Sequence, residues 1–394
     1  MPKIFSLKLK ELLVILYLAS LMMPSLGIKI SSIGTLKVSM IISYFIIFIF
    51  HNSKVNLRNF IPILLILTAY LLTFLWSVSY SNSIIGAIGI IQLIIYSFSF
   101  LLIINHYNRS IFIKLLLSSI VIVCVFSIIY YILGIITYNG DYSENAKNLG
   151  IMIDRSMIRA KGFTDDPNIF SLYVGICLII SALNPIKKNK NFILFLLLIT
   201  FLLTLSRGGI IAMIIAISAT TIVKLFLSPQ QEIKKVILVL LVLLIIILAV
   251  AYIILFNDTL LNIIVKRLNN INSASGRFEL WSLAFKAFHE RPIFGHGIFT
   301  TKYIFEQILG KPAYTHNTFI ELLLEGGSYL IFSFAAFLFY LLTQIFNKIK
   351  DNTWLFCIFL FIIIQFMTLS LSFNEFIYFL FSFILIYSSR KNLR

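Results

Sequence analysis

The stretch HNTFIELLLEGGSYLIFSFAAFLFYLLTQIF, residues 316–346, joins a polar segment to an apolar run long enough to cross a bilayer. A helix needs roughly 20 apolar residues to span the hydrocarbon, and residues 326–346 have that length and character. The ten residues before them contain a histidine, an asparagine and two glutamates. We therefore expect a membrane helix that carries functional side chains at its amino-terminal end.

The composition extends this interpretation to the whole chain. Of the 394 residues, 60% are hydrophobic and only 12% are charged, which is too apolar for a water-soluble domain. We expect one all-α membrane domain over residues 1–394, with two short pairs, 167–206 and 353–389, that are also typical of re-entrant segments. The twelve candidate spans are residues 11–28, 35–51, 59–77, 84–104, 111–137, 167–183, 190–206, 208–227, 235–256, 326–346, 353–372 and 374–389.

The distribution of basic residues predicts the orientation, because short cytoplasmic loops are enriched in lysine and arginine. With a cytoplasmic N-terminus, the inner segments hold 18 of the 32 basic residues and three of the 15 acidic ones. Both termini are then cytoplasmic. The net charge of +17 mostly reflects this topology, so nucleic acid is not expected as a partner.

Two segments on the outward side are too long for simple turns, residues 138–166 and 257–325. Long loops in compact proteins are usually functional or disordered. Within the second, residues 275–291 carry aromatic side chains at helical spacing, and Pro292 should end that helix. The segment could equally be an amphipathic helix on the outer leaflet, above a lipid substrate.

The residues around His316 resemble a helix start. Thr318 and Glu321 match a capping box, in which each side chain bonds the backbone of the other. A helix start favours anions and should lower the pKa of His316, which makes this residue our first candidate for a catalytic base; the alternative is a histidine that only bonds loop backbone. Glu325, one turn after Glu321, is expected to be the freer carboxylate and is the second candidate.

Arginine placement suggests phosphate binding. Six of the 14 outward basic residues are arginines, and the planar guanidinium fork suits phosphate and pyrophosphate. Arg207 lies between two apolar spans, where a charge is costly and normally functional, unless it is an arginine that snorkels to the surface. The candidate phosphate-binding residues are Arg159, Arg207, Arg277 and Arg291.

Several motifs in this order resemble the O-antigen ligase and O-antigen polymerase family of bacterial envelopes. The resemblance is strong in the C-terminal half and limited to topology in the N-terminal half. The motifs are Asp166-Pro167-Asn168, Ser206-Arg207-Gly208-Gly209, Ser275-Gly276-Arg277 with Trp281, Arg291-Pro292-x-x-Gly295-x-Gly297, and His316-Asn317-x-x-x-x-Leu322 with Gly326-x-x-Tyr329.

The resemblance implies a glycosyltransferase-C-like helical architecture in the bacterial inner membrane, with an extracytoplasmic site. It implies an inverting, metal-independent transfer without a cofactor, from a glycan donor linked to undecaprenyl pyrophosphate. Arg207 and Arg277 would hold the pyrophosphate, and His316 would be the active-site histidine. Asp166 and Asn317 are expected to contact substrate. Membrane lipids, a glycan acceptor and a chain-length regulator are the implied partners.

Three functions stay open on the sequence. A polymerase adds glycan to another lipid-linked repeat unit, whereas a ligase transfers it to the lipid A core. The stretch from Arg159 to Asn168 favours the polymerase, and the eight-residue spacing between the His316-Asn317 and Gly326-x-x-Tyr329 motifs weakens the ligase. A lipid-linked oligosaccharide flippase should carry charges within several spans, but the spans here are nearly uncharged at mid-length.

Overall fold

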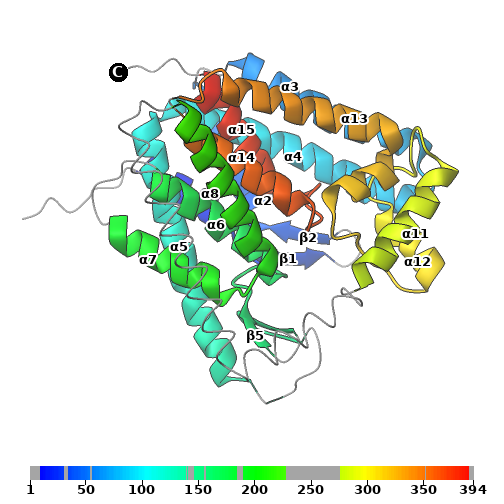
Figure 1. Cartoon of the computed structure of the whole chain (residues 1–394), viewed down its shortest axis with the longest axis horizontal. Coiled ribbons are helices and arrows are strands. Elements are labelled where there is room, and N and C mark those ends of the chain that lie inside the picture. Colours follow the sequence, from blue (N-terminus) through cyan, green and yellow to red (C-terminus); the bar gives the residue numbers. More distant parts are fainter. Residues whose placement is uncertain are drawn as a thin grey trace, which may run out of the picture.

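The computed structural model of the chain describes residues 9–30, 34–53, 56–138, 140, 146–154, 157–183, 190–227, 276–350 and 352–389. Helices dominate these residues, as the apolar composition predicts (Figure 1). The strands are short and lie in two small antiparallel sheets. The all-α prediction is therefore correct for the membrane part and incomplete for the loops.

The helices are α1 (Leu9–Leu21), α2 (Val38–Phe50), α3 (Ile61–Leu72), α4 (Tyr80–His106), α5 (Arg109–Ile136), α6 (Pro167–Leu183), α7 (Lys190–Leu203), α8 (Arg207–Leu227), α11 (Arg277–Glu290), α12 (Thr301–Leu309), α13 (Thr318–Phe346), α14 (Thr353–Phe366) and α15 (Glu375–Ser389). Two 3-10 turns, η1 (Leu57–Asn59) and η2 (Thr73–Trp76), flank α3. The strands are β1 (Gly27–Ile30), β2 (Gly34–Lys37), β3 (Lys147–Asn148), β4 (Ile151–Asp154) and β5 (Met157–Ala160).

Four of the described helices, α4, α5, α8 and α13, are long and apolar enough to cross a membrane. Six shorter apolar segments accompany them: α2, α3 with η2, α6, α7, α14 and α15. Ten of the twelve predicted spans thus coincide with apolar helices, although their number as true crossings stays a prediction. The predicted span at 235–256 lies outside the described residues.

The predicted helix at residues 11–28 is wrong beyond Leu21. Pro24 lacks a backbone N–H and cannot continue a helical ladder, and the chain turns there into the β1–β2 hairpin. In that hairpin, Gly27 pairs with Lys37 and Ile30 with Gly34. The predicted span 353–372 also ends early, at Phe366, and residues 367–372 form an irregular segment that becomes important at the site.

The described part of the first long loop contains a small sheet. Strands β3, β4 and β5 form a three-stranded antiparallel sheet, with Met152 opposite Arg159 and Ile151 opposite Ala160. The sheet packs on α5, where the N–H of Gly150 donates to the carbonyl of Tyr130 at 3.3 Å. Residues 138–166 therefore include a small β-sheet that packs at one end of α5.

The centre of the fold is α15, in which every side chain from Phe376 to Ser388 is buried. A helix that is apolar all round is expected in such a position. Helices α3, α4 and α13 pack against it (Figure 1). At its start, Glu375 accepts two hydrogen bonds from Lys37 (2.8 and 3.0 Å), which ties the β1–β2 hairpin to the core.

Helix α13 is broken at Gly327, where φ is +62° and ψ is −160°. This break leaves backbone groups without helical partners, and irregular backbone in a membrane protein requires partners from elsewhere in the chain. Residues 292–297 supply them. The four bonds run from the N–H of His296 to the Leu324 carbonyl (3.1 Å), Gly297 to Glu325 (2.7 Å), Ser328 to Pro292 (2.9 Å) and Tyr329 to Ile293 (2.9 Å).

Candidate active site

The start of α8 is held by a capped turn. The hydroxyl of Ser206 accepts the N–H of Gly209 at 3.1 Å, which makes it the cap of this helix. The same hydroxyl donates to the side-chain carbonyl of Asn168 at 2.8 Å, so the starts of α8 and α6 are linked. Arg207, the first residue of α8, is exposed at this junction.

Arg159 holds the junction together. Its side chain is only 8% exposed, and its guanidinium donates to the Thr204 carbonyl (3.0 Å), the Asp154 carboxylate (2.7 Å) and the Asn168 side chain (2.9 Å). These bonds join β5 to β4, to the first turn of α6 and to the turn before α8. The structure therefore does not support the predicted substrate contact for Arg159, because its donors point to internal partners.

Asp166 caps α6. Its Oδ1 accepts the backbone N–H of Asn168 at 2.7 Å and the amide of the same residue at 2.8 Å, and Pro167 occupies the first helical position, where its missing N–H is not needed. The side chain is half-buried. Asp166 is therefore a helix cap, and its negative charge also raises the pKa of His316.

Helix α11 brings in Arg277. The helix runs from Arg277 to Glu290 and ends before Pro292, as predicted. The guanidinium of Arg277 donates to the carbonyl of Thr368 at 3.4 Å. A side chain at Gly208 would approach the Thr368 hydroxyl to 3.3 Å, so the glycine after Arg207 lets the start of α8 lie close to the residue that Arg277 contacts.

His316 precedes α13 in a left-handed backbone conformation, with φ of +50°. It is half-buried. Burial lowers its pKa below the usual value for histidine, the positive charge of Arg277 lowers the pKa further, and the carboxylate of Asp166 raises it in part. The charges of Arg277 and Asp166 thus act on the pKa of His316 although these residues come from distant parts of the chain.

The capping prediction for α13 is wrong by one residue. Asn317, not Thr318, is the cap: its side chain accepts the N–H groups of Phe319 (3.0 Å) and Ile320 (3.2 Å). Asparagine is among the strongest capping residues. Asn317 is therefore buried and committed to the helix start, which leaves its predicted substrate contact without support. Glu321 does not reach back, and its Oε2 has no hydrogen-bond partner among the described residues.

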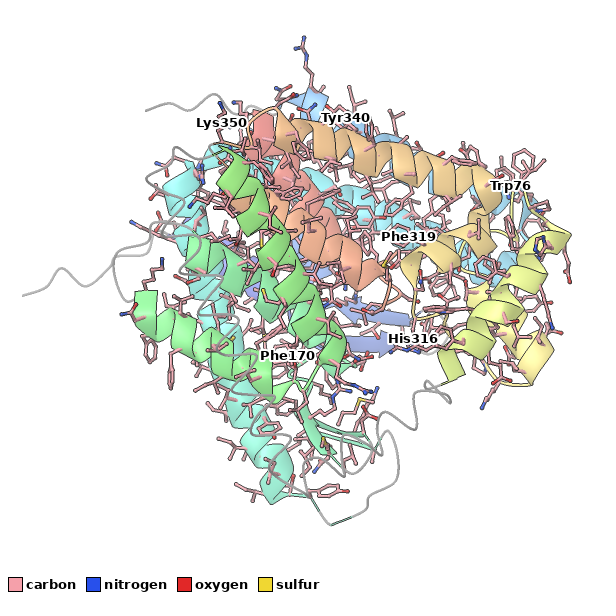
Figure 2. All side chains as sticks on the ribbon, in the orientation of Figure 1. Trp76, Phe170, His316, Phe319, Tyr340 and Lys350 are labelled. Carbon is pink, nitrogen blue, oxygen red and sulfur yellow. The ribbon has the colours of Figure 1, made fainter. Side chains whose placement is uncertain are left out.

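Residues 367–372, between α14 and α15, connect these parts. Besides the bond from Arg277, the Asn317 amide donates to the carbonyl of Met367 at 3.4 Å. Thr318 donates to the carbonyl of Leu369 (2.7 Å) and accepts the N–H of Leu371 (3.0 Å). The amino ends of α8, α11 and α13 thus gather around one short segment. Figure 2 shows His316 in this region, at the far end of the molecule from Lys350.

This arrangement suits an anionic ligand. Each helix start carries a positive partial charge, and Arg207 and Arg277 add two full charges at two of the starts. His316 supplies a group that stays neutral at neutral pH because its pKa is lowered. The chemistry available is therefore neutralisation of a phosphate-like anion beside a base.

Glu325 lies in a second polar region, and the prediction that it is the freer carboxylate is wrong. It is fully buried, and both oxygens accept hydrogen bonds. Oε2 accepts from the Tyr70 hydroxyl and from the N–H of Phe299 (2.8 Å), and Oε1 accepts from the N–H (3.1 Å) and hydroxyl (2.7 Å) of Thr301. Glu325 thereby anchors the start of α12 to α13.

Arg291 is separated from the other arginines. Between it and Arg277 lies the whole of α11, which at 1.5 Å per residue is about 20 Å long. Arg291 is exposed and donates to the carbonyl of Trp76 at 3.3 Å. The structure therefore does not bring Arg291 to the site at His316, contrary to the prediction.

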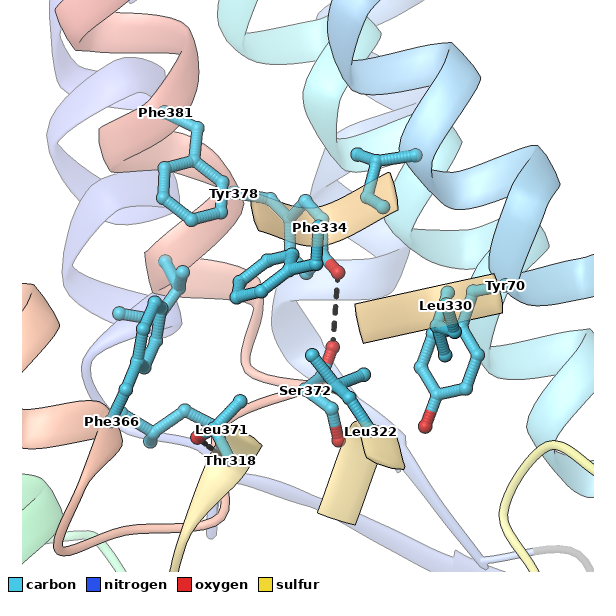
Figure 3. A pocket seen from close by; sticks show the side chains of 12 residues that line it. Tyr70, Thr318, Leu322, Leu330, Phe334, Phe366, Leu371, Ser372, Tyr378 and Phe381 are labelled. Atoms are coloured by element: carbon cyan, nitrogen blue, oxygen red, sulfur yellow. Dashed lines mark hydrogen bonds between the residues drawn. The ribbon is translucent and has the colours of Figure 1, made fainter. Parts of the chain in front are cut away.

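The sequence did not reveal the contacts that Ser206, Thr368 and Tyr70 make. Ser206 had a local signal, because serine three residues before Gly209 fits a helix cap. Thr368 and Tyr70 had none, since each acts through a partner that is distant in sequence. A small cavity of about 10 Å³ lies between Tyr70, Thr318 and Ser372 (Figure 3). It has room for about one water molecule, so a glycan cannot enter it.

No group of three His, Cys, Asp or Glu side chains that could hold a metal ion occurs in the part of the chain that the structure describes. The apolar helices indicate a membrane-embedded protein, and Arg207 and Arg277 lie at the starts of two of its helices. Residues 192–335 match the family model described as O-antigen ligase. This similarity agrees with the resemblance to the O-antigen polymerase and ligase family that the motifs carry. The comparison with curated proteins found no match.

The matched region contains Arg207, Arg277 and His316 and ends within α13. Arg159 and Asp166 precede it, although the structure links both to the start of α8 or to His316. The site thus extends beyond the matched segment, into the folded first loop.

Proposed function

We propose that the protein polymerises oligosaccharide repeat units linked to undecaprenyl pyrophosphate, at the outer face of a bacterial inner membrane. The observation that carries the proposal is the grouping of His316 with Arg277 and with the start of α8, in a domain of this family. A glycosyl pyrophosphate needs its departing charge neutralised, and the acceptor hydroxyl needs a base. These residues supply both.

The transfer would proceed in one displacement. The acceptor hydroxyl attacks the anomeric carbon of the donor glycan while His316 takes the hydroxyl proton. The bond from that carbon to the pyrophosphate oxygen breaks, and undecaprenyl pyrophosphate leaves with the bonding electrons. Arg207, Arg277 and the helix starts stabilise the charge that develops on the leaving group. A single displacement inverts the anomeric centre and does not require a metal ion.

The preference for the polymerase over the ligase comes from the sequence. The stretch from Arg159 to Asn168, which favours the polymerase on the sequence, is hydrogen-bonded to the turn before Arg207. The ligase remains the second candidate, because the matching family model is described by that activity.

Replacement of the three central residues tests the site. We expect Arg207→Ala, Arg277→Ala and His316→Ala each to lower the rate of glycan extension by about 10²-fold or more, since loss of one preorganised charge-stabilising group has this effect. Arg277→Lys should also extend glycan poorly, because lysine lacks the planar fork. Extension is measured on gels of surface glycan, at matched protein levels in the membrane. Normal long chains in all three alanine variants would contradict the site.

A deletion strain separates the candidate functions. A single repeat unit on the core would identify a polymerase, and bare core with accumulated lipid-linked polymer would identify a ligase. Lipid-linked units trapped on the cytoplasmic side would instead indicate a flippase.

A further inference from the structure

Residues 291–294 form an exposed apolar loop next to two apolar helices. Ile293 is 60% exposed and Phe294 is also exposed, although neither belongs to a membrane-length helix. Exposed apolar side chains in adjacent positions usually mark a surface that another apolar phase covers. The loop follows α11 directly and contains no acidic residue.

The loop is continuous with an apolar surface on α3 and α13. These helices pack against each other along their length (Figure 1). Leu65 on α3 and Phe332 on α13, the latter 72% exposed, are among the side chains that face outward from the pair. Leu75, in the turn after α3, is 66% exposed. An apolar surface on helices of a membrane protein is expected to face lipid.

Aromatic side chains mark the boundary of that surface. The indole N–H of Trp76 donates to the carbonyl of Phe294 at 2.6 Å, and their rings lie 5.0 Å apart. Tyr329 lies 6.0 Å from Trp76 and 6.3 Å from Phe294. Tryptophan and tyrosine are enriched where the hydrocarbon meets the head groups. Arg291 adjoins this cluster through its bond to the Trp76 carbonyl.

We propose that residues 291–294 anchor the protein in the phospholipid leaflet on the side of the candidate site. Ile293 and Phe294 enter the acyl region, and Arg291 lies at the level of the lipid phosphates. Arginine side chains commonly place their stems along apolar surface and their charge among head groups in this way. The occupant of the surface is the bilayer itself, and Arg291 is a lipid contact.

The backbone fixes the depth of this anchor. The carbonyls of Pro292 and Ile293 accept the N–H groups of Ser328 and Tyr329, immediately after the break in α13. The loop therefore cannot leave the leaflet without losing bonds that complete this helix. The leaflet thus sets the height of α11 and α12, and with them the height of Arg277.

Spin-label depth measurement on the full-length protein in phospholipid nanodiscs tests the proposal. A nitroxide is attached at Ile293→Cys, at Arg291→Cys and, as a matched control, at Ile308→Cys on α12, where the native isoleucine is similarly apolar and exposed. The native cysteines are buried, so the unsubstituted protein measures background labelling. Collisions with oxygen report the acyl region, and collisions with a water-soluble nickel chelate report water.

The nitroxide at position 293 should collide mainly with oxygen, and the nitroxide at position 308 should collide mainly with the nickel chelate. The ratio of the two collision rates at position 291 should lie between these values. Equal ratios of the two collision rates at positions 293 and 308 would overturn the proposal. If the label at position 293 prevents folding, Leu75→Cys gives the same test from the neighbouring turn, with the same expected and contradicting results. Because depth is measured without glycan transfer, the result is independent of the proposed activity.

Discussion

The helix starts around residues 367–372 and the break in α13 both concentrate charged and polar side chains, but they use them differently. At the break, Glu325 is buried, and both of its carboxylate oxygens accept hydrogen bonds from donors within the protein. At the helix starts, Arg207 is exposed and Arg277 and His316 are half-buried. The first region holds α12 in place through internal hydrogen bonds, and the second contains the charges that we propose bind the substrate. A polar residue in an apolar chain is therefore weak evidence of function when, like Glu325, it is buried and its oxygens accept several internal hydrogen bonds.

The largest effect should follow from a side chain at the break itself. In Gly327→Ala, the new Cβ would lie 2.4 Å from the Ile293 carbonyl oxygen in a backbone conformation that only glycine adopts readily. Strain and crowding together should cost about 4 kcal/mol. The thermal midpoint of the detergent-solubilised protein should fall steeply. In the control Gly310→Ala, φ is similarly positive but the space is open, so the loss should be about 1 kcal/mol. Equal losses would show that crowding at the break is unimportant.

Glu325→Gln should act on stability rather than on transfer. The amide has one acceptor oxygen where the carboxylate has two, so donors from Tyr70 or Thr301 lose partners, at a cost of about 2 kcal/mol. The folded fraction should still extend glycan. Glu321→Gln is the matched control, and it should cost less because Oε2 of Glu321 accepts no hydrogen bond from any described residue. Unchanged stability with lost extension would instead make Glu325 a catalytic residue.

The pH dependence of transfer should report the charges around His316. A base must be unprotonated, so the rate should fall as the pH drops below the lowered pKa of His316. Asp166→Asn keeps a capping side chain but removes a carboxylate that raises this pKa, so the acidic decline should move to lower pH. Asp165→Asn is the control and should leave the profile unchanged. A shift to higher pH in Asp166→Asn would contradict the geometry around His316.

The smallest effect is expected at Arg291. Because the length of α11 separates it from Arg277, Arg291→Ala should change the rate of glycan extension by less than about fivefold, the effect of losing an exposed contact of up to 1 kcal/mol. The rate is measured beside that of Arg277→Ala. A loss as large as in Arg277→Ala would place Arg291 in the transfer site and remove the distinction between the two ends of α11.

Local features were predictable from the sequence because their causes are local. Apolar runs fix most helices, since each must bury its backbone bonds within the bilayer, and Pro292 ends α11 because it cannot donate to a helical ladder. The resemblance to the O-antigen polymerase and ligase family could also be recognised in the sequence, and the family model that matches residues 192–335 agrees with it. The errors at residues 22–28 and at the cap of α13 are errors of boundary.

Only the tertiary structure decided which polar residues serve the fold. Tyr70 and Glu325 are 255 residues apart in the chain and share a hydrogen bond, and Arg159 is occupied by partners from the Asp154 strand, α6 and the turn before α8. A sequence shows that a charge is present, but the partners that desolvate and pair it come from distant segments. The sequence by itself therefore determined the membrane character, the helices and the candidate charges, whereas packing decided that Arg159, Asn317 and Glu325 are held by internal hydrogen bonds.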